Sequence, residues 1–156
     1  MPSKPDVSTA EEVAIGPLEP GELGQVLALL ARSGLPEAGL ADHLATTLVA
    51  RQEGQVVGSV ALELYGEAAL LRSVAVAPEL RGRGLGQRLT NSALALARQA
   101  GVRRLYLLTE SAADYFARQG FTPIPRGEVE GAVQQSVEFT SACPQSAQAM
   151  VLALAS

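Results

Sequence analysis

The sequence predicts an α+β (mixed α/β) fold, in which helices flank a twisted sheet of six to seven strands. Two observations carry this prediction. Three consecutive apolar segments, 46–51, 55–65 and 70–76, are separated by short turns, which is typical of antiparallel strands. An amphipathic helix and a further strand at 103–108 follow, and this order makes the two flanking strands parallel neighbours or near neighbours. A mixed sheet is therefore expected, and not a doubly wound parallel one.

The chain of 156 residues is long enough for one domain with its own core. Residues 1–10 contain two prolines and mostly small polar residues, so they are expected to form a flexible tail, and 11–156 a single domain. Local signals predict the first elements of that domain. They are a strand at 12–15 closed by Gly16 and Pro17, a helix from 19–22 to Gly34, and a second helix from Leu35 to about Leu44.

The segments 46–51 and 55–65 form a predicted hairpin that turns at Glu53 and Gly54. Alternate residues of a strand point to opposite faces, so the second strand has one apolar face and one mixed face. The mixed face holds Ser59, Ala61, Glu63 and Tyr65, opposite Val56, Val60, Leu62 and Leu64. A turn at Gly66 and Glu67 leads into the next strand.

The stretch from 70 to 100 joins a strand to a helix through a glycine-rich loop. Pro78 ends the strand because proline cannot donate an amide N–H to a ladder. Arg81-Gly82-Arg83-Gly84-Leu85-Gly86 follows, and an apolar stripe from Leu85 to Ala100 predicts a helix that begins inside or just after the loop. Unpaired amides at a helix N-terminus and glycines that admit a ligand close to the backbone form a cradle for phosphate oxygens. Walker and dinucleotide loops are excluded, because no Lys-Ser or Lys-Thr follows and position 87 is Gln87.

The elements after this helix are short. Gly101 ends the helix, and apolar runs alternate with turn signals to the end of the chain. The expected elements are a strand at 103–108, a helix with a capping box at Ser111–Asp114 that ends at Gly120, a strand at 121–124, a short helix around 128–134 and a strand at 148–153.

The composition excludes several classes of function. A net charge of −4 without a basic tract argues against a nucleic-acid partner. One cysteine, Cys143, and one histidine, His43, are too few for a thiolate or multi-histidine metal site, so no metal is expected. No apolar run approaches the length of a membrane span and the N-terminus lacks a signal-peptide core, so the expectation is a cytoplasmic protein without a membrane partner.

The loop Arg81–Gly86 fits the pattern (Arg/Gln)-x-x-Gly-x-(Gly/Ala). With the strand before it, the helix after it and Gly120-Phe121 downstream, it resembles the GNAT superfamily of acetyl-CoA-dependent N-acetyltransferases. The resemblance implies the GNAT fold, whose central parallel strands splay apart. It also implies acetyl-CoA (coenzyme A) as cofactor, with its pyrophosphate in the loop and its pantetheine arm along the first splayed strand. The cofactor-binding residues that it implies are Val74, Ala75, Val76, Arg81, Gly82, Arg83, Gly84, Leu85, Gly86 and Gln87.

Acetyl transfer needs a group that takes a proton from the amine and a group that protonates the leaving thiolate. Glu63 is the first candidate base and Glu110 the second; the alternatives are a solvent-facing strand residue and a helix N-terminal charge. Many GNAT enzymes have a tyrosine four residues before the glycine of the Gly-Phe pair, but here that position is Phe116. The thiolate is therefore expected to take its proton from water, Tyr65 or Tyr106.

Two subfamily resemblances concern the acceptor. The segments 69–86 and 102–126 are similar to short GNAT proteins linked to arsenic resistance, and also to the acetyltransferase domain of N-acetylglutamate synthases. Both resemblances imply a small-molecule amine acceptor, an amino acid or analogue, with arginine and hydroxyl partners for its carboxylate. The candidates are Arg72, Arg126, Ser73, Thr109 and Ser146.

The chain departs from the glutamate synthases at two places. Pro144 and Ile15-Gly16 stand where those enzymes have arginines, so glutamate itself is not the expected acceptor. The expected function is acetylation of a small amine by direct attack in a ternary complex, with a role in resistance to arsenic compounds or other xenobiotics. The alternative is a catalytically weak sensor or scaffold that binds acetyl-CoA, since fold does not dictate function. Dimers are common among relatives, which leaves a homodimer open.

Overall fold

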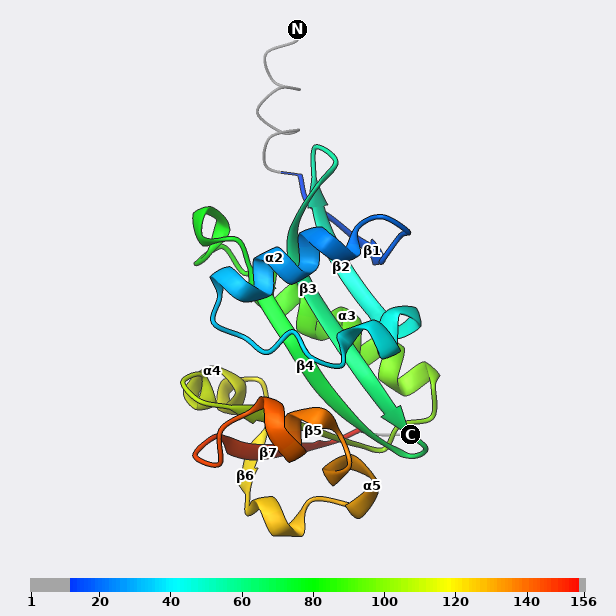
Figure 1. The fold of residues 1–156 in the computed structure, drawn as a ribbon, viewed down its shortest axis with the longest axis vertical. Helices are drawn as coiled ribbons and strands as arrows, with labels where there is room; N and C mark the ends of the chain where they lie inside the picture. The colour runs from blue at the N-terminus through cyan, green and yellow to red at the C-terminus, as the bar shows by residue number, and fades with distance from the viewer. Residues whose placement is uncertain (1–11, 155–156) are drawn as a thin grey trace, which may run out of the picture.

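The computed structural model describes residues 12–154, so the tail predicted at 1–10 lies outside the described residues. One seven-stranded sheet runs through the molecule in the order β1-β2-β3-β4-β5-β7-β6 (Figure 1). The β4–β5 pair is parallel and the other pairs are antiparallel, which confirms the predicted mixed sheet. The strands are β1 Ala14–Pro17, β2 Thr47–Gln52, β3 Gln55–Tyr65, β4 Ala68–Val76, β5 Arg104–Thr109, β6 Thr122–Ile124 and β7 Gln148–Ala153.

Two amphipathic helices cover opposite faces of the sheet around β3 and β4 (Figure 1). In front lies α2 (Leu23–Arg32), which buries Val26, Leu29 and Leu30. Behind lies α3 (Leu85–Gln99), which starts within the glycine-rich loop as the sequence predicts. The remaining helices are α4 Ala113–Arg118, α5 Gly131–Gln134, the 3-10 helices Leu40–Thr46, Pro78–Leu80 and Arg126–Glu128, and a π-helical turn at Glu138–Ala142.

The strands β2 and β3 form the predicted hairpin. Glu53 and Gly54 both have positive φ, 52° and 79°. This backbone suits the right-handed twist of the two strands and explains the glycine at the turn.

The parallel pair β4–β5 separates soon after it begins. Its pairing runs from Ala68 opposite Arg104 to Leu70 opposite Tyr106, while β4 stays paired with β3 as far as Val76. A bulge lies where the strands have separated: Ser73 has φ of +61°, and the hydroxyl of buried Ser59 donates to the Ser73 carbonyl at 2.7 Å. Left-handed backbone at a non-glycine residue costs about 1–3 kcal/mol, and the Ser59 contact helps to hold it. The splayed pair is the one that the resemblance implied.

Three sequence-based expectations were wrong. The first strand includes Gly16 and Pro17, because they pair with β2 at the sheet edge. The helix expected at 35–44 is a 3-10 helix at Leu40–Thr46, because Gly39 has φ of +84° and ends any α-helical run before it. The capping box of α4 does not form. The N-cap is Ala112, which has no side chain that could cap the helix. Thr109 Oγ1 accepts the Ala112 N–H at 2.9 Å just before the helix begins.

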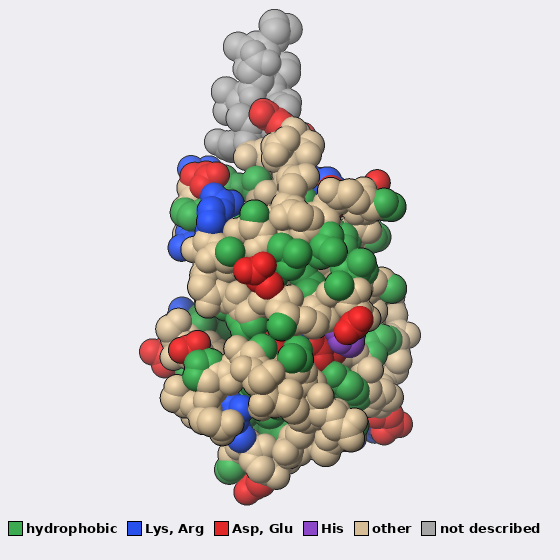
Figure 2. All heavy atoms as spheres, in the orientation of Figure 1, with side chains coloured by type: hydrophobic (Ala, Val, Ile, Leu, Met, Phe, Trp, Pro, Cys, Tyr) green, Lys and Arg blue, Asp and Glu red, His purple; other side chains and the backbone are tan. Residues whose placement is uncertain are grey.

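A smaller apolar cluster holds the segment 126–142 against the sheet. Val129, Val133 and Phe139 pack there on residues of β4, β5 and β7. The helix expected around 128–134 shortens to α5, and a π-helical turn follows it. Among residues 12–154, no helix combines the length and the apolar character needed to cross a membrane. On the face seen in Figure 2, several Lys and Arg side chains lie close together at the upper left, and the others are isolated.

Candidate active site

Two adjoining cavities open at the split between β4 and β5. One, of about 430 Å³, lies between the separated strands; the other, of about 560 Å³, lies along the glycine-rich loop. The cavities meet at the five residues that line both of them: Ser33, Leu35, Val74, Ala112 and Phe116. We call them the strand cavity and the loop cavity.

The loop cavity is walled by nine of the ten residues predicted to bind a cofactor. Its wall includes Val74–Val76, Arg81, Gly82 and Gly84–Gln87. Arg83, the exception, faces a separate depression beside Arg88.

The loop requires glycine at two positions because the backbone there has positive φ. Gly82 and Gly84 have φ of +83° and +82°, and no atom lies within 4 Å of a Cβ built on either. The first turn of α3 therefore presents its free amides beside open backbone, which suits phosphate oxygens. Arg81 lies at this loop, where its Nε donates to the Val76 carbonyl at 3.0 Å.

The edge of β4 faces the split between the strands. Because the ladder to β5 ends at Leu70, the backbone groups of 71–76 that point toward β5 have no strand partner there. Residues 71–74 line the strand cavity and 74–76 line the loop cavity. A buried backbone amide needs a partner, so this edge can bind an extended polar ligand.

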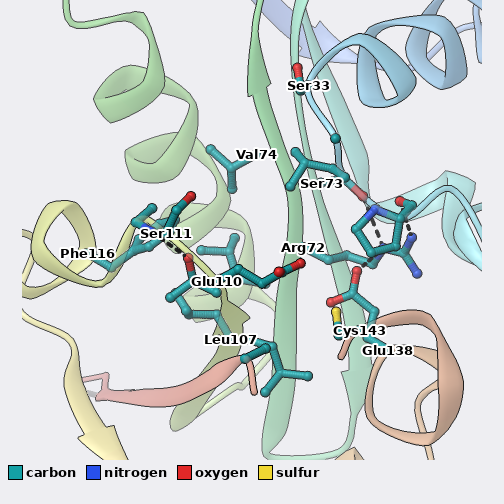
Figure 3. A pocket seen from close by; sticks show the side chains of 18 residues that line it. Ser33, Arg72, Ser73, Val74, Leu107, Glu110, Ser111, Phe116, Glu138 and Cys143 are labelled. Atoms are coloured by element: carbon teal, nitrogen blue, oxygen red, sulfur yellow. Dashed lines mark hydrogen bonds and ion pairs between the residues drawn. The ribbon is translucent and has the colours of Figure 1, made fainter. Parts of the chain in front are cut away.

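Arg72 forms the centre of a buried ionic network beside the strand cavity (Figure 3). Its side chain is 0% exposed. Its Nη1 donates to Glu63 Oε2 at 2.8 Å, and its Nε lies 3.4 Å from Glu138 Oε2. Nε also donates to Ser73 Oγ at 3.0 Å, and Nη2 to the Pro36 carbonyl at 3.3 Å. One guanidinium is therefore shared by two carboxylates.

Glu63, the first candidate base, lies behind Arg72 and is 1% exposed. Neither Glu63 nor Tyr65 is among the residues that line the two cavities. Tyr65 Oη donates to Glu63 Oε1 at 2.5 Å, and His43 Nε2 lies 3.8 Å from Oε2. Burial raises the pKa of Glu63, but hydrogen bonds from Tyr65 and Arg72 outweigh it and hold the pKa below its ordinary value. Burial and the Glu63 carboxylate raise the pKa of Tyr65 to about 12.

Glu138 is a functional candidate that sequence reasoning missed. It lies in the π-helical turn, lines the strand cavity and is 3% exposed. Burial raises its pKa to about 7; Arg72 opposes this effect and Glu63 adds to it. Burial, with the nearby Glu138, raises the pKa of the Cys143 thiol to about 12. The one sequence signal was a carboxylate between apolar Val137 and Phe139.

The structure brings part of the predicted acceptor set together. Arg72, Ser73 and Thr109 line the strand cavity. Glu110, the second candidate base, also lines it and extends from the end of β5 toward β4 (Figure 3). Ser146 is exposed and is not among the lining residues.

Arg126 lies away from the cavity wall and binds the chain that forms part of it. Its guanidinium donates to the carbonyls of Pro144 at 3.0 Å and of Ala147 and Phe139 at 3.3 Å each. The guanidinium also lies 5.4 Å from the centre of the Phe139 ring. Arg126 therefore fixes the segment that carries Glu138.

Three aromatic residues that bear on the proton donor, Phe116, Tyr106 and Tyr115, have different surroundings. Phe116 lies where the cavities meet and packs edge-to-face on Phe121. Tyr106 Oη is 3.0 Å from Glu130 Oε2, outside both cavities. Tyr115 lines the loop cavity, where a Cβ on Gly86 would lie 3.1 Å from its hydroxyl.

The chain is similar to known proteins both in sequence and in structure. The family model "Acetyltransferase (GNAT) domain" matches residues 43–123. An uncharacterized N-acetyltransferase of Chlorobaculum tepidum is 31% identical over 118 residues, which cover 75% of this chain and 73% of that protein. An amino-acid acetyltransferase of Mycobacterium tuberculosis is 35% identical over 91 residues. That match covers 58% of this chain and 49% of the relative, so the chain spans about half the length of that enzyme.

Two solved structures share the fold. The N-acetylglutamate synthase of Neisseria gonorrhoeae, complexed with coenzyme A and N-acetyl-glutamate, superposes with a TM-score of 0.80 and 21% identity. The match covers 93% of this chain and 36% of that one. A Mycobacterium tuberculosis protein in complex with CoA superposes with a TM-score of 0.77 and 23% identity, over 91% of this chain and 99% of that one.

Proposed function

The chain belongs to the GNAT acetyltransferase domain family, and from that premise we propose that it transfers the acetyl group of acetyl-CoA to the amine of an amino acid or amino-acid analogue. The observation that carries the proposal is the meeting of the two cavities at Val74 and Phe116. An extended cofactor in one cavity and a small acceptor in the other would bring their reacting ends together there.

The loop cavity fits coenzyme A. Gly82 and Gly84 leave the backbone open, and the first turn of α3 offers amides for a pyrophosphate. The unpaired edge of β4 offers amides and carbonyls to a pantetheine arm. Bound there, acetyl-CoA supplies the activated thioester, and a backbone N–H near Val74 would polarise its carbonyl.

The strand cavity has the size of a small-molecule site, about 430 Å³. Its wall supports direct attack by the acceptor amine in a ternary complex. Cys143 is the one thiol of the chain, and with a pKa of about 12 it is almost entirely protonated at neutral pH. An acyl-cysteine intermediate would need the thiolate, so direct transfer is the simpler route.

The proposal is tested by incubating the protein with acetyl-CoA and a panel of amino acids and measuring release of free thiol. Turnover of at least one amine is expected. Gly84→Asp should abolish coenzyme A binding in calorimetry, because it places a carboxylate among the phosphates at a φ of +82°. Gly101→Asp is the matched control, since Gly101 has φ of +85° and lies at the far end of α3. Equal affinity in both variants would refute the loop assignment.

A sensor or scaffold that binds acetyl-CoA is the second candidate function. It is favoured by Phe116, which has no proton to give where the cavities meet. Tight binding of acetyl-CoA without turnover across the panel would support it, and turnover of any amine would remove it. A role in arsenic resistance, a homodimer and a cytoplasmic location stay predictions of the sequence.

A further inference from the structure

The strand cavity contains a carboxyl group for which the function so far has no use. Glu138 is buried in the π-helical turn and reaches the cavity wall beside Arg72 and Cys143 (Figure 3). Its carboxylate shares the Arg72 guanidinium with Glu63, at 3.4 Å from Nε. A buried carboxylate that shares its cationic partner with a second carboxylate and lines a cavity is a candidate proton acceptor.

We propose that Glu138 is the catalytic base, which takes a proton from the ammonium group of the acceptor. This inference rests on the proposed function and adds a residue to it. Glu138 accepts one proton from R–NH₃⁺, and the amine nitrogen then bonds to the thioester carbonyl carbon as the C–S bond breaks. The leaving thiolate takes the surplus proton of the nitrogen, which gives the amide, the free thiol of coenzyme A and a neutral Glu138 carboxylic acid. Glu138 returns its proton to solvent.

Position separates Glu138 from the two predicted bases. Glu63 lies behind Arg72, away from the lining of both cavities, and its oxygens already accept hydrogen bonds from Tyr65 and Arg72. Glu110 lines the strand cavity but is exposed, so water solvates its charge and weakens its pull on an ammonium group. Glu138 combines access to the cavity with burial.

The groups around Glu138 set its titration. Arg72 on β4 favours the charged form, while Glu63 on β3 opposes it. Cys143, at the end of the same turn, hydrogen-bonds to the carboxylate, and Glu110 lines the cavity from the loop after β5. These effects and burial place its pKa at about 7, where a base is half deprotonated under physiological conditions.

The test uses Glu138→Gln and Glu138→Asp in the full chain, with Glu128→Gln as control because Glu128 is exposed and outside both cavities. Coenzyme A affinity and kcat against pH are measured with the best acceptor of the panel. Glu138→Gln should lower kcat by about 100-fold while coenzyme A affinity stays unchanged. In the profile of kcat against pH, the fall of kcat toward acid pH should move in Glu138→Gln from near pH 7 to the pKa of the acceptor's own ammonium group. Glu138→Asp should restore part of kcat.

The inference is overturned if kcat of Glu138→Gln still falls toward acid pH near pH 7, or if its kcat equals that of the wild type. Either result leaves the proposed function standing. A wild-type protein that turns over no amine overturns both. The aspartate variant distinguishes a base from a space-filling side chain, because it keeps the carboxylate while removing one methylene. Equal loss in the aspartate and glutamine variants, with both folded and binding coenzyme A, would also count against the base.

Discussion

Replacing Glu138 by glutamine should make the protein more stable at alkaline pH, even as it lowers kcat. The folded state raises the pKa of this carboxyl from 4.5 to about 7, so the folded protein binds a proton more tightly than the unfolded chain. Stability that depends on this proton is fully present below pH 4.5 and is lost as pH rises through about 7. Glutamine has nearly the same shape and never ionises, so the variant escapes that loss.

The size of this pH-dependent change in stability follows from the difference between the unfolded and folded pKa values of Glu138. Each pH unit between the unfolded and folded pKa values is worth about 1.4 kcal/mol. The total for Glu138 is therefore on the order of 3 kcal/mol. For a domain of this size, that corresponds to a shift of roughly 6–12 °C in Tm.

The assay is chemical denaturation of wild type, Glu138→Gln and the control Glu128→Gln at pH 5 and pH 8. Subtracting the wild type at each pH removes the titration of all other groups. The difference for Glu138→Gln should grow in favour of the variant from pH 5 to pH 8, and the difference for Glu128→Gln should stay flat. A difference for Glu138→Gln that does not change with pH would mean that this carboxyl titrates as it does in water, and the reasoning about its burial would be refuted.

Three further predictions concern the network around the cavity. Glu63→Gln removes the charge paired with buried Arg72 and should lower the free energy of unfolding at pH 7 by about 3 kcal/mol. A decrease of less than about 1 kcal/mol in denaturant titrations would show that the pair is effectively solvated. Acceptors with one carboxylate should have at least about tenfold higher kcat/KM than dicarboxylates. The reason is that Arg72 is the one guanidinium among the residues described as lining the strand cavity, and Glu63 and Glu138 already share it. Equal kcat/KM values for glutamine and glutamate would contradict this prediction. Arg126→Met should lower Tm by about 2–4 °C, because its contacts with three carbonyls are lost. It should also raise the KM for the acceptor but not the KM for acetyl-CoA. An unchanged KM for the acceptor would show that the segment around Phe139 keeps its position without Arg126.

Local signals predicted most of the fold. The bounds of β3 and β7 agree with the sequence because alternating apolar residues, Glu53-Gly54 and flanking turns act over a few positions. The loop cavity was predictable for the same reason, since its backbone and its helix start are adjacent in the chain. The helix expected at 35–44 failed because Gly39 packs against a distant segment: a Cβ there would lie 2.5 Å from Val137 Cγ1.

The strand cavity could not be predicted in the same way. Alternation along β3 predicted Glu63 and Tyr65 on one face, and the two side chains do form a hydrogen bond. Nothing local indicated that Arg72 would pair with Glu63. Glu138 becomes a titratable group near neutrality through burial against β4, and its neighbours Arg72 and Glu63 lie far away in the chain. Periodicity reports which residues are buried together in one element; it does not report which charges meet across elements.

The short β4–β5 pairing has a consequence for how the stability of the protein depends on a bound ligand. Three residue pairs join these strands before they part, so the middle of the sheet lacks part of its own hydrogen bonding. A ligand that fills this gap supplies the missing bonds and stabilises the native chain by about 2.7 kcal/mol at one hundred times its dissociation constant. If acetyl-CoA is that ligand, the resistance of the protein to proteolysis should rise with the acetyl-CoA concentration.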